Sequence, residues 1–226
     1  LTIDLFGWEV DITRKVQEFD AKPTRFLRDG LFWMGLRGVA GVLLALSVGL
    51  FWWKAHRLEA IFLASVAVLD GFNFLLRAMV ARPRPSVDLV DVAGGPQGAS
   101  FPSGTALHVF LFYGLLIFLA SPYISTRRLK YAVWLIATIY ISTTGVWLIY
   151  DGRHWFTDVM GGYIYGAFYL LALMAAFSAS ASALPHASSR RLPLSSSRSK
   201  RATSRVRRAA INSAVASSAE IVCCGA

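Results

Sequence analysis

The sequence predicts an all-α protein, a polytopic bundle of membrane-spanning helices, and three observations support this. Hydrophobic residues make up 55% of the 226 residues, and the mean hydropathy is +0.51, which is more apolar than a soluble domain usually is. Five apolar runs are each long enough to cross a bilayer, which takes about 20 residues. Basic connecting loops alternate along the chain with loops whose charges are balanced, which is the distribution of positive charge expected in membrane proteins.

The expected transmembrane helices cover residues 31–53, 58–76, 103–121, 131–150 and 157–177. Together they form one predicted membrane domain over residues 31–177. None is expected to be a signal peptide, because each is too long and the first follows a polar-rich stretch.

The segments on either side differ from this domain in composition. Residues 1–30 mix acids with bases and are expected to form an interfacial or helical lead-in. Residues 178–226 are rich in Ser, Ala and Arg, carry eight Lys and Arg against one acid, and predict a disordered extension. Its bases suit anionic membrane lipids, and no nucleic-acid partner is expected.

The charge of the loops predicts how the chain is oriented in a cell membrane. Loops 54–57 and 122–130 are basic, as is the C-terminal tail, whereas loops 77–102 and 151–156 offset their arginines with aspartates. Basic segments stay in the cytoplasm. We therefore expect a multi-pass membrane protein with loops 77–102 and 151–156 on the extracytoplasmic face.

The first of these outer loops begins with an arginine cluster, Arg77 to Pro85, that also contains Arg82 and Arg84. Arginine suits phosphate because its planar fork donates two parallel hydrogen bonds and keeps its charge. The prolines prevent the helix from continuing. An interfacial belt of arginines that reach the lipid headgroups would give the same pattern.

The same loop ends at Pro102-Ser103-Gly104-Thr105, where the next span begins. Ser103 is a natural N-cap, and Gly104 allows a ligand to approach the backbone. The free amides of this helix start are suited to an anion. An ordinary helix cap explains these residues equally well.

The second outer loop contains His154 and Asp158, four residues apart and therefore on one face of a helical turn. A carboxylate that accepts the Nδ1 proton of a histidine leaves Nε2 available as a nucleophile or base. A metal site is not expected, because a third ligand is missing. The alternative is an interfacial histidine beside Trp155. The three features share one face of the membrane, which predicts a phosphate-binding site there.

These residues resemble the three-part signature of the type-2 phosphatidic acid phosphatase superfamily, which includes lipid phosphate phosphatases, polyprenyl diphosphate phosphatases and vanadium haloperoxidases. Its first motif, Lys, six residues and Arg-Pro, corresponds to Arg77 and Arg84-Pro85. Its second, Pro-Ser-Gly-His, corresponds to residues 102–105. Its third, Ser-Arg, five residues, His, three residues and Asp, corresponds to Trp147-Leu148, His154 and Asp158. Members commonly have six spans, which implies that the first lies outside this sequence.

The resemblance implies a membrane phosphatase that hydrolyses lipid-linked phosphate or diphosphate without metal or cofactor. His154 would attack phosphorus and form a phosphohistidine, and Asp158 would orient it. The residues implied in phosphate binding are Arg77, Arg84, Ser103 and Gly104.

Two departures from the signature weaken the expected catalytic machinery. Thr105 replaces the histidine that protonates the leaving oxygen, and losing a general acid typically costs about 10²–10⁴ in rate. Leu148 replaces a phosphate-clamping arginine, a loss of about 10²–10³ by analogy with an oxyanion donor. His108 and Arg153 are neighbours that could compensate. Without the acid, we expect diphosphates to be favoured over monophosphates, because their leaving group is already a stabilised anion.

Three alternatives remain at the level of sequence. The chain could be a catalytically impaired relative that binds phosphorylated lipids without turnover. A haloperoxidase is disfavoured by the five spans. A transporter is disfavoured because the ionisable groups gather at one face, with Asp70 and Asn73 the notable polar residues at depth.

Overall fold

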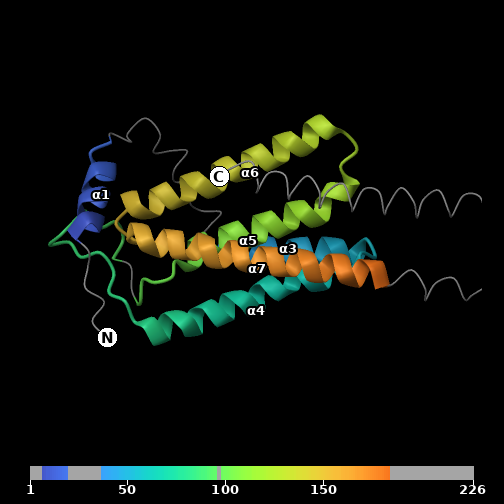
Figure 1. Cartoon of the computed structure of the whole chain (residues 1–226), viewed down its shortest axis with the longest axis horizontal. Coiled ribbons are helices and arrows are strands. Elements are labelled where there is room, and N and C mark those ends of the chain that lie inside the picture. The colour runs from blue at the N-terminus through green and yellow to red at the C-terminus, as the bar shows by residue number, and fades with distance from the viewer. Residues whose placement is uncertain (1–6, 20–36, 96–97, 184–226) are drawn as a thin grey trace, which may run out of the picture.

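The structure, a computed structural model, describes residues 7–19, 37–95 and 98–183, and every structural statement below concerns these residues. This part of the chain is all helical and contains no strand, which confirms the predicted fold class (Figure 1). The beginning of the first expected span and the C-terminal tail beyond residue 183 lie outside the described residues.

Four helices are long and apolar enough to cross a membrane. They are α4 (Arg57–Val80), α5 (Gly104–Ala120, extended by the 3₁₀ turn η2, Ser121–Tyr123), α6 (Arg127–Tyr150) and α7 (Phe156–Ala183). The remaining expected span, the first in the chain, corresponds to α3 (Arg37–Trp53), an apolar helix that is shorter within the described residues.

Helix α5 forms the centre of the bundle and packs against α3, α4, α6 and α7 (Figure 1). Its sequence is apolar on every side, as expected for a helix surrounded by other helices. Leu107, Leu111 and Leu115 are fully buried in the core. Glycine lets α7 approach closely, since a Cβ at Gly162 would lie 2.6 Å from the carbonyl oxygen of Ser103.

The outer faces of the surrounding helices remain apolar. On α4, for example, Val68, Phe72 and Leu75 are exposed. A broad apolar surface of this kind suits the hydrocarbon of a bilayer, where every backbone polar group must be satisfied within its own helix.

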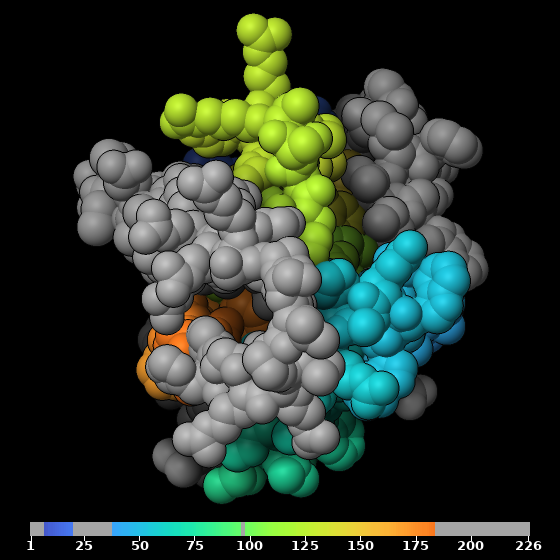
Figure 2. Space-filling model, turned by 90° about the vertical axis from the view of Figure 1, so that its right-hand side faces the viewer, coloured from blue at the N-terminus to red at the C-terminus, as the bar shows by residue number. Residues whose placement is uncertain are grey.

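Two sets of connections lie at opposite ends of the bundle. The segment 81–103, the turn 151–155 and helix α1 (Gly7–Gln17) lie at one end (Figure 1). The α3–α4 and α5–α6 connections lie at the other end, which Figure 2 views directly. This is the separation of loops that strict alternation of spans predicts.

Helix α1 is fastened to the first of these ends by side-chain contacts. The amide nitrogen of Gln17 donates to the carbonyl oxygens of Asp91, at 2.7 Å, and Tyr150, at 2.9 Å. The ring of Trp8 meets Phe156 edge-on with centroids 6.1 Å apart. The predicted lead-in therefore contains a helix that covers the starts of the site loops.

Helix α7 continues to Ala183, past residue 178, where the sequence analysis began the polar tail. The serines of this stretch do not interrupt the helix because their hydroxyls bond to its own carbonyls. Ser178 donates to the oxygen of Met174 and Ser180 to that of Ala176, both at 2.8 Å. Composition alone therefore placed the end of the helix too early.

Candidate active site

The start of α5 supplies a set of backbone amides at the end of the bundle that carries α1. Ser103 is the N-cap, as predicted, and its Oγ accepts the amide of Ala106 at 3.3 Å. The amide of Ser103 donates to the carbonyl oxygen of Asp158 at 2.9 Å, which ties the start of α5 to the start of α7. A helix start of this kind favours an anion.

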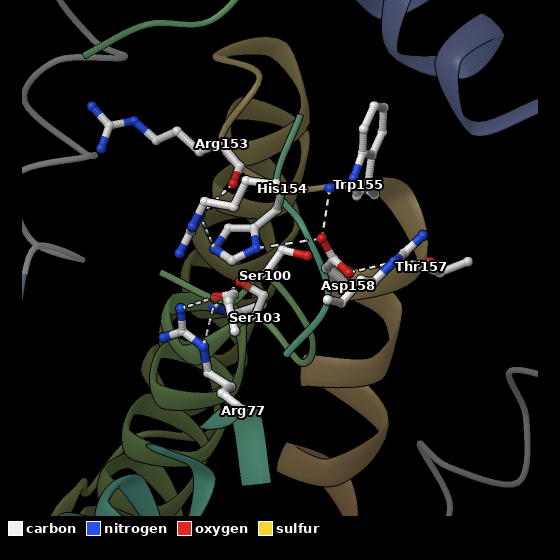
Figure 3. A network of polar contacts seen from close by, with 12 residues as sticks. Arg77, Ser100, Ser103, Arg153, His154, Trp155, Thr157 and Asp158 are labelled. Carbon is white, nitrogen blue, oxygen red and sulfur yellow. Dashed lines mark hydrogen bonds and ion pairs between the residues drawn. The ribbon is translucent and has the colours of Figure 1, made fainter. Parts of the chain in front are cut away.

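Arg77, in the last turn of α4, lies beside this helix start (Figure 3). Its Nε donates to the carbonyl oxygen of Ala99 at 3.1 Å. A Cβ on Gly104 would lie 3.3 Å from Nη1 of Arg77 and 3.3 Å from Nδ2 of Asn73. Glycine at this position therefore lets α4 bring its guanidinium close to the amides of α5.

Arg84 links the arginine cluster to the histidine of the second loop. Its Nη1 donates to the carbonyl oxygen of Arg153 and lies 3.3 Å from Nε2 of His154. A guanidinium can only donate, so Nε2 must accept and the ring proton of neutral His154 belongs on Nδ1. That nitrogen faces Asp158, with 3.6 Å between Nδ1 and Oδ2.

Burial lowers the pKa of His154, and the positive charge of Arg84 acts in the same direction. The neighbouring carboxylate of Asp158 opposes this shift of the pKa without reversing it. The imidazole is therefore neutral near neutral pH, with an available lone pair on Nε2. This is the protonation state that a histidine nucleophile needs.

Asp158 is itself held from two sides. Its Oδ2 accepts the backbone amide of Trp155 at 2.8 Å, and its Oδ1 lies 2.6 Å from Nη1 of Arg82 (Figure 3). Arg82 is buried and also forms an ion pair with Glu9 of α1. Glu9 in turn accepts the backbone amide of Thr157 at 3.2 Å.

Sequence reasoning found the Arg82 cluster but assigned Arg82 no place in the site, and it missed Glu9 altogether. The position of Arg82 within the Arg-Pro-Arg-Pro run was an available signal. Glu9 gave none, because it is one of several acids in a mixed-charge segment. Its burial is visible only once α1 is packed against α6 and α7.

The six site residues predicted from sequence thus gather at one end of the bundle. They are Arg77, Arg84, Ser103, Gly104, His154 and Asp158. Among the described residues, no three His, Cys, Asp or Glu side chains are grouped as a metal site.

Comparison with known proteins agrees with this arrangement. The family model described as the PAP2 superfamily matches residues 58–181, more than half of the chain. The chain belongs to the PAP2 superfamily. The resemblance drawn from the three motifs is therefore confirmed. A comparison with curated protein sequences gives no significant match.

Two solved PAP2 structures share the fold. The PAP2-type phosphatidylglycerolphosphate phosphatase from Bacillus subtilis has a TM-score of 0.67 at 18% identity, covering 79% of this chain and 87% of that one. LpxE from Aquifex aeolicus has a TM-score of 0.58 at 20% identity, covering 77% of this chain and 99% of that one. At these identities the likeness concerns the fold.

The third PAP2 motif lacks its arginine, and the structure offers no replacement at that point. Leu148 is buried and packs with Ala106, Ile149 and Val159. Arg153, which could have compensated, extends away from His154 (Figure 3). Its Nη2 lies near Gly94, 3.1 Å from where a Cβ would be, and its Nε is 3.8 Å from Asp151.

The second PAP2 motif lacks its histidine, and the replacement, Thr105, lies beside both polar and apolar residues. Thr105 lines a pocket of about 380 Å³ between α3, α4 and α5, together with Arg77, Gly104 and His108. The wall formed by α3 is apolar, with Ala40 and Leu44. The pocket thus joins the start of α5 to the apolar surface of α3.

Proposed function

We propose that this PAP2 protein is an integral membrane phosphatase that hydrolyses lipid-linked phosphate or diphosphate through a phosphohistidine on His154. One observation carries the proposal: the buried imidazole of His154 has its Nδ1 turned to Asp158 and its Nε2 3.3 Å from Arg84. Burial lowers its pKa, which favours the neutral ring. A side chain held this way presents a lone pair to an anion bound by the neighbouring cations.

The chemistry proceeds in two displacements. Nε2 of His154 attacks phosphorus, an N–P bond forms, and the bond from phosphorus to the leaving oxygen breaks. Asp158 stabilises the positive charge that develops on the ring. Water then attacks the phosphohistidine, which releases phosphate and restores the imidazole.

The negative charge of the phosphoryl oxygens is stabilised by cations and backbone amides that already lie around His154 and the start of α5. Arg84 exchanges its contact with Nε2 for one with a phosphoryl oxygen when substrate binds. Arg77 and the amides of the α5 N-terminus, next to Ser103 and Gly104, complete the anion site. Donors fixed before the reaction stabilise the charge at little reorganisation cost.

The substrate is a phosphorylated membrane lipid, and diphosphates are favoured. The pocket beside Arg77 has an apolar wall, which suits the first part of a lipid tail. Thr105 is no general acid near neutral pH, and a diphosphate is the substrate class that least needs one. The solved relative from Bacillus subtilis is named for a phosphorylated lipid.

The site faces the extracytoplasmic side. This assignment rests on the basic loops at the opposite end of the bundle and on the basic tail, which remain cytoplasmic.

A phosphate-release assay in detergent tests the function. Purified protein is given a polyprenyl diphosphate, phosphatidylglycerophosphate and phosphatidate, beside a His154→Ala variant. We expect release by the wild type, strongest for the diphosphate, and none by the variant. A matched His56→Ala variant, changed at the far end of the bundle, should keep its activity. Acid-labile label on the protein after a pulse with radioactive substrate would report the phosphohistidine.

The loss of the motif arginine at Leu148 favours a second candidate, a lipid-binding protein without turnover. Such a protein would retain vesicles that contain phosphorylated lipid but release no phosphate, and His154→Ala would have no rate to remove. Release that is insensitive to His154→Ala would contradict both candidates.

A further inference from the structure

The pocket between α3, α4 and α5 contains a second carboxylate–imidazole pair that the proposed function has not used. Nδ1 of His108, on α5, lies 2.6 Å from Oδ2 of Asp70, on α4. Both residues line the pocket together with Arg77 and Thr105. The pair is therefore part of the same pocket as the anion-binding helix start.

The geometry fixes the role of each ring nitrogen. Asp70 accepts a proton from Nδ1, which leaves Nε2 as the free end of the ring, and in the described part of the chain Nε2 has no hydrogen-bond partner. His108 is more than nine-tenths buried and stacks on Phe112 with ring centroids 5.4 Å apart. An unpartnered buried nitrogen is costly unless a ligand or water meets it in some state of the protein.

The direction of the displacement places the leaving oxygen on this side. In phosphoryl transfer the attacking and leaving atoms are roughly in line with phosphorus between them. The amide of Ser103 donates to the carbonyl oxygen of Asp158 on α7, whereas a Cβ at Gly104 would point to the side chains of Arg77 and Asn73 on α4. His154 does not line the pocket between α3, α4 and α5. Because Arg77, Gly104 and Thr105 line that pocket, an oxygen that leaves a phosphate held there opposite His154 would emerge into it.

The leaving oxygen of a phosphate monoester needs a proton, and few groups in the pocket can give one. Arg77 keeps its protons, and the Asn73 amide and the Thr105 hydroxyl are not acids near neutral pH. An imidazole can hand on a proton from one ring nitrogen while a carboxylate holds the other. His108 is the pocket residue with that capacity.

We propose that His108, positioned by Asp70, is the proton donor for the leaving oxygen of lipid phosphate monoesters. This inference rests on the proposed phosphatase function. As the P–O bond breaks, the proton on Nε2 of His108 moves to the leaving oxygen and the lipid departs as an alcohol. In the second displacement neutral Nε2 takes a proton from the attacking water, so His108 returns to its starting state.

His108 lies deeper in the bundle than Thr105, so we expect it to act as proton donor for monoesters and not to make them better substrates than diphosphates. Three residues beyond Thr105, it lies about 4.5 Å further along α5, at 1.5 Å per residue, on roughly the same helix face. Diphosphates, whose leaving phosphate is stable as an anion, remain the better substrates. Turnover of monoesters depends on His108.

A substrate-dependent comparison of His108→Gln with wild type tests the proposal. We expect kcat/KM for phosphatidate to fall at least 10²-fold, the usual effect of removing a general acid, and kcat/KM for a polyprenyl diphosphate to fall less than about tenfold. His56→Gln, the same change at the far end of the bundle, is the matched control and should leave the ratio of the two rates unaltered. Equal losses for both substrates would mean that His108 is only structural and would overturn the proposal.

Two further variants extend the test, and the first of them, Asp70→Asn, keeps it decisive if His108→Gln does not fold. Asp70→Asn should lower the monoester rate selectively, because it removes the group that orients the ring. Adding Thr105→His to His108→Gln should restore monoester hydrolysis by at least tenfold through an imidazole one turn nearer the phosphate. A folded Asp70→Asn protein with an unchanged ratio of rates would contradict the proposal.

Failure of this inference can be told from failure of the function itself. Wild-type protein that hydrolyses diphosphate in a His154-dependent manner, but never a monoester, refutes the role of His108 alone. Absence of all His154-dependent release refutes both.

Discussion

Nη1 of Arg82 lies 2.6 Å from Oδ1 of Asp158, so the carboxylate that faces His154 is held from behind by a buried guanidinium. The other end of the same guanidinium forms an ion pair with Glu9 of α1. Glu9 lies more than seventy residues before Arg82 in the chain. Through Arg82 and Asp158, it contributes to the position of His154, the proposed nucleophile. Helix α1 is therefore part of the structure that positions the site residues.

Glu9→Ala should destabilise the protein and lower its activity. Glu9→Ala removes one of the two carboxylates that pair with buried Arg82, and breaking a buried ion pair typically costs about 3–5 kcal/mol. Thermal unfolding in detergent should show a lower midpoint, and kcat should fall because the guanidinium that holds Asp158 is no longer fixed from its other end. Glu18→Ala, an exposed acid just after α1, is the control and should change neither quantity. An unaltered midpoint for Glu9→Ala would show that the pair does not form.

Asp158→Asn should leave the fold recognisable but reduce kcat by about 10⁴, the effect seen when the orienting carboxylate of a catalytic histidine is removed. An amide can donate to Nδ1, which would favour the proton on Nε2 and block attack on phosphorus. Steady-state kinetics beside a measurement of phosphate affinity checks this. A change confined to KM would argue instead for a role in binding.

In a plot of kcat/KM against pH, the loss of activity on the acid side should have its midpoint below pH 6.5, the ordinary pKa of a histidine. Burial disfavours the charged ring, so the folded pKa is lowered and the neutral form persists to lower pH. Activity is then lost only as the pH falls through that lowered value. Arg84→Gln removes a positive charge near His154 and should move this midpoint to higher pH, besides slowing the reaction. A wild-type midpoint above pH 6.5 would be inconsistent with the buried, neutral ring.

Gly104→Ala should weaken phosphate binding several-fold with little loss of stability. The new Cβ would lie 3.3 Å from both Nη1 of Arg77 and Nδ2 of Asn73, so the end of the flexible arginine has to move. KM for a lipid phosphate, and inhibition by inorganic phosphate, report the change. Gly49→Ala is a matched control because a Cβ there meets nothing within 4 Å. Equal behaviour of the two variants would show that Arg77 does not act at the start of α5.

The local parts of the site followed from sequence because their spacing alone determines their geometry. Ser103 lies directly before a helix start, and His154, in the turn that precedes α7, is only four residues before Asp158 in its first turn. The arginine cluster follows the end of an apolar run. Each of these relationships spans only a few residues, so no knowledge of packing was needed to predict it.

The apolar runs by themselves determined that the chain is a bundle of membrane helices, because a backbone in lipid must satisfy its hydrogen bonds within each segment. Only the tertiary structure decided that Glu9 reaches Arg82, that Asp70 pairs with His108, and that Arg153 turns away from His154. The first two join residues on different helices, and the third depends on the path of a short loop. The physical reason is that side chains far apart in sequence meet only where helix packing brings their faces together.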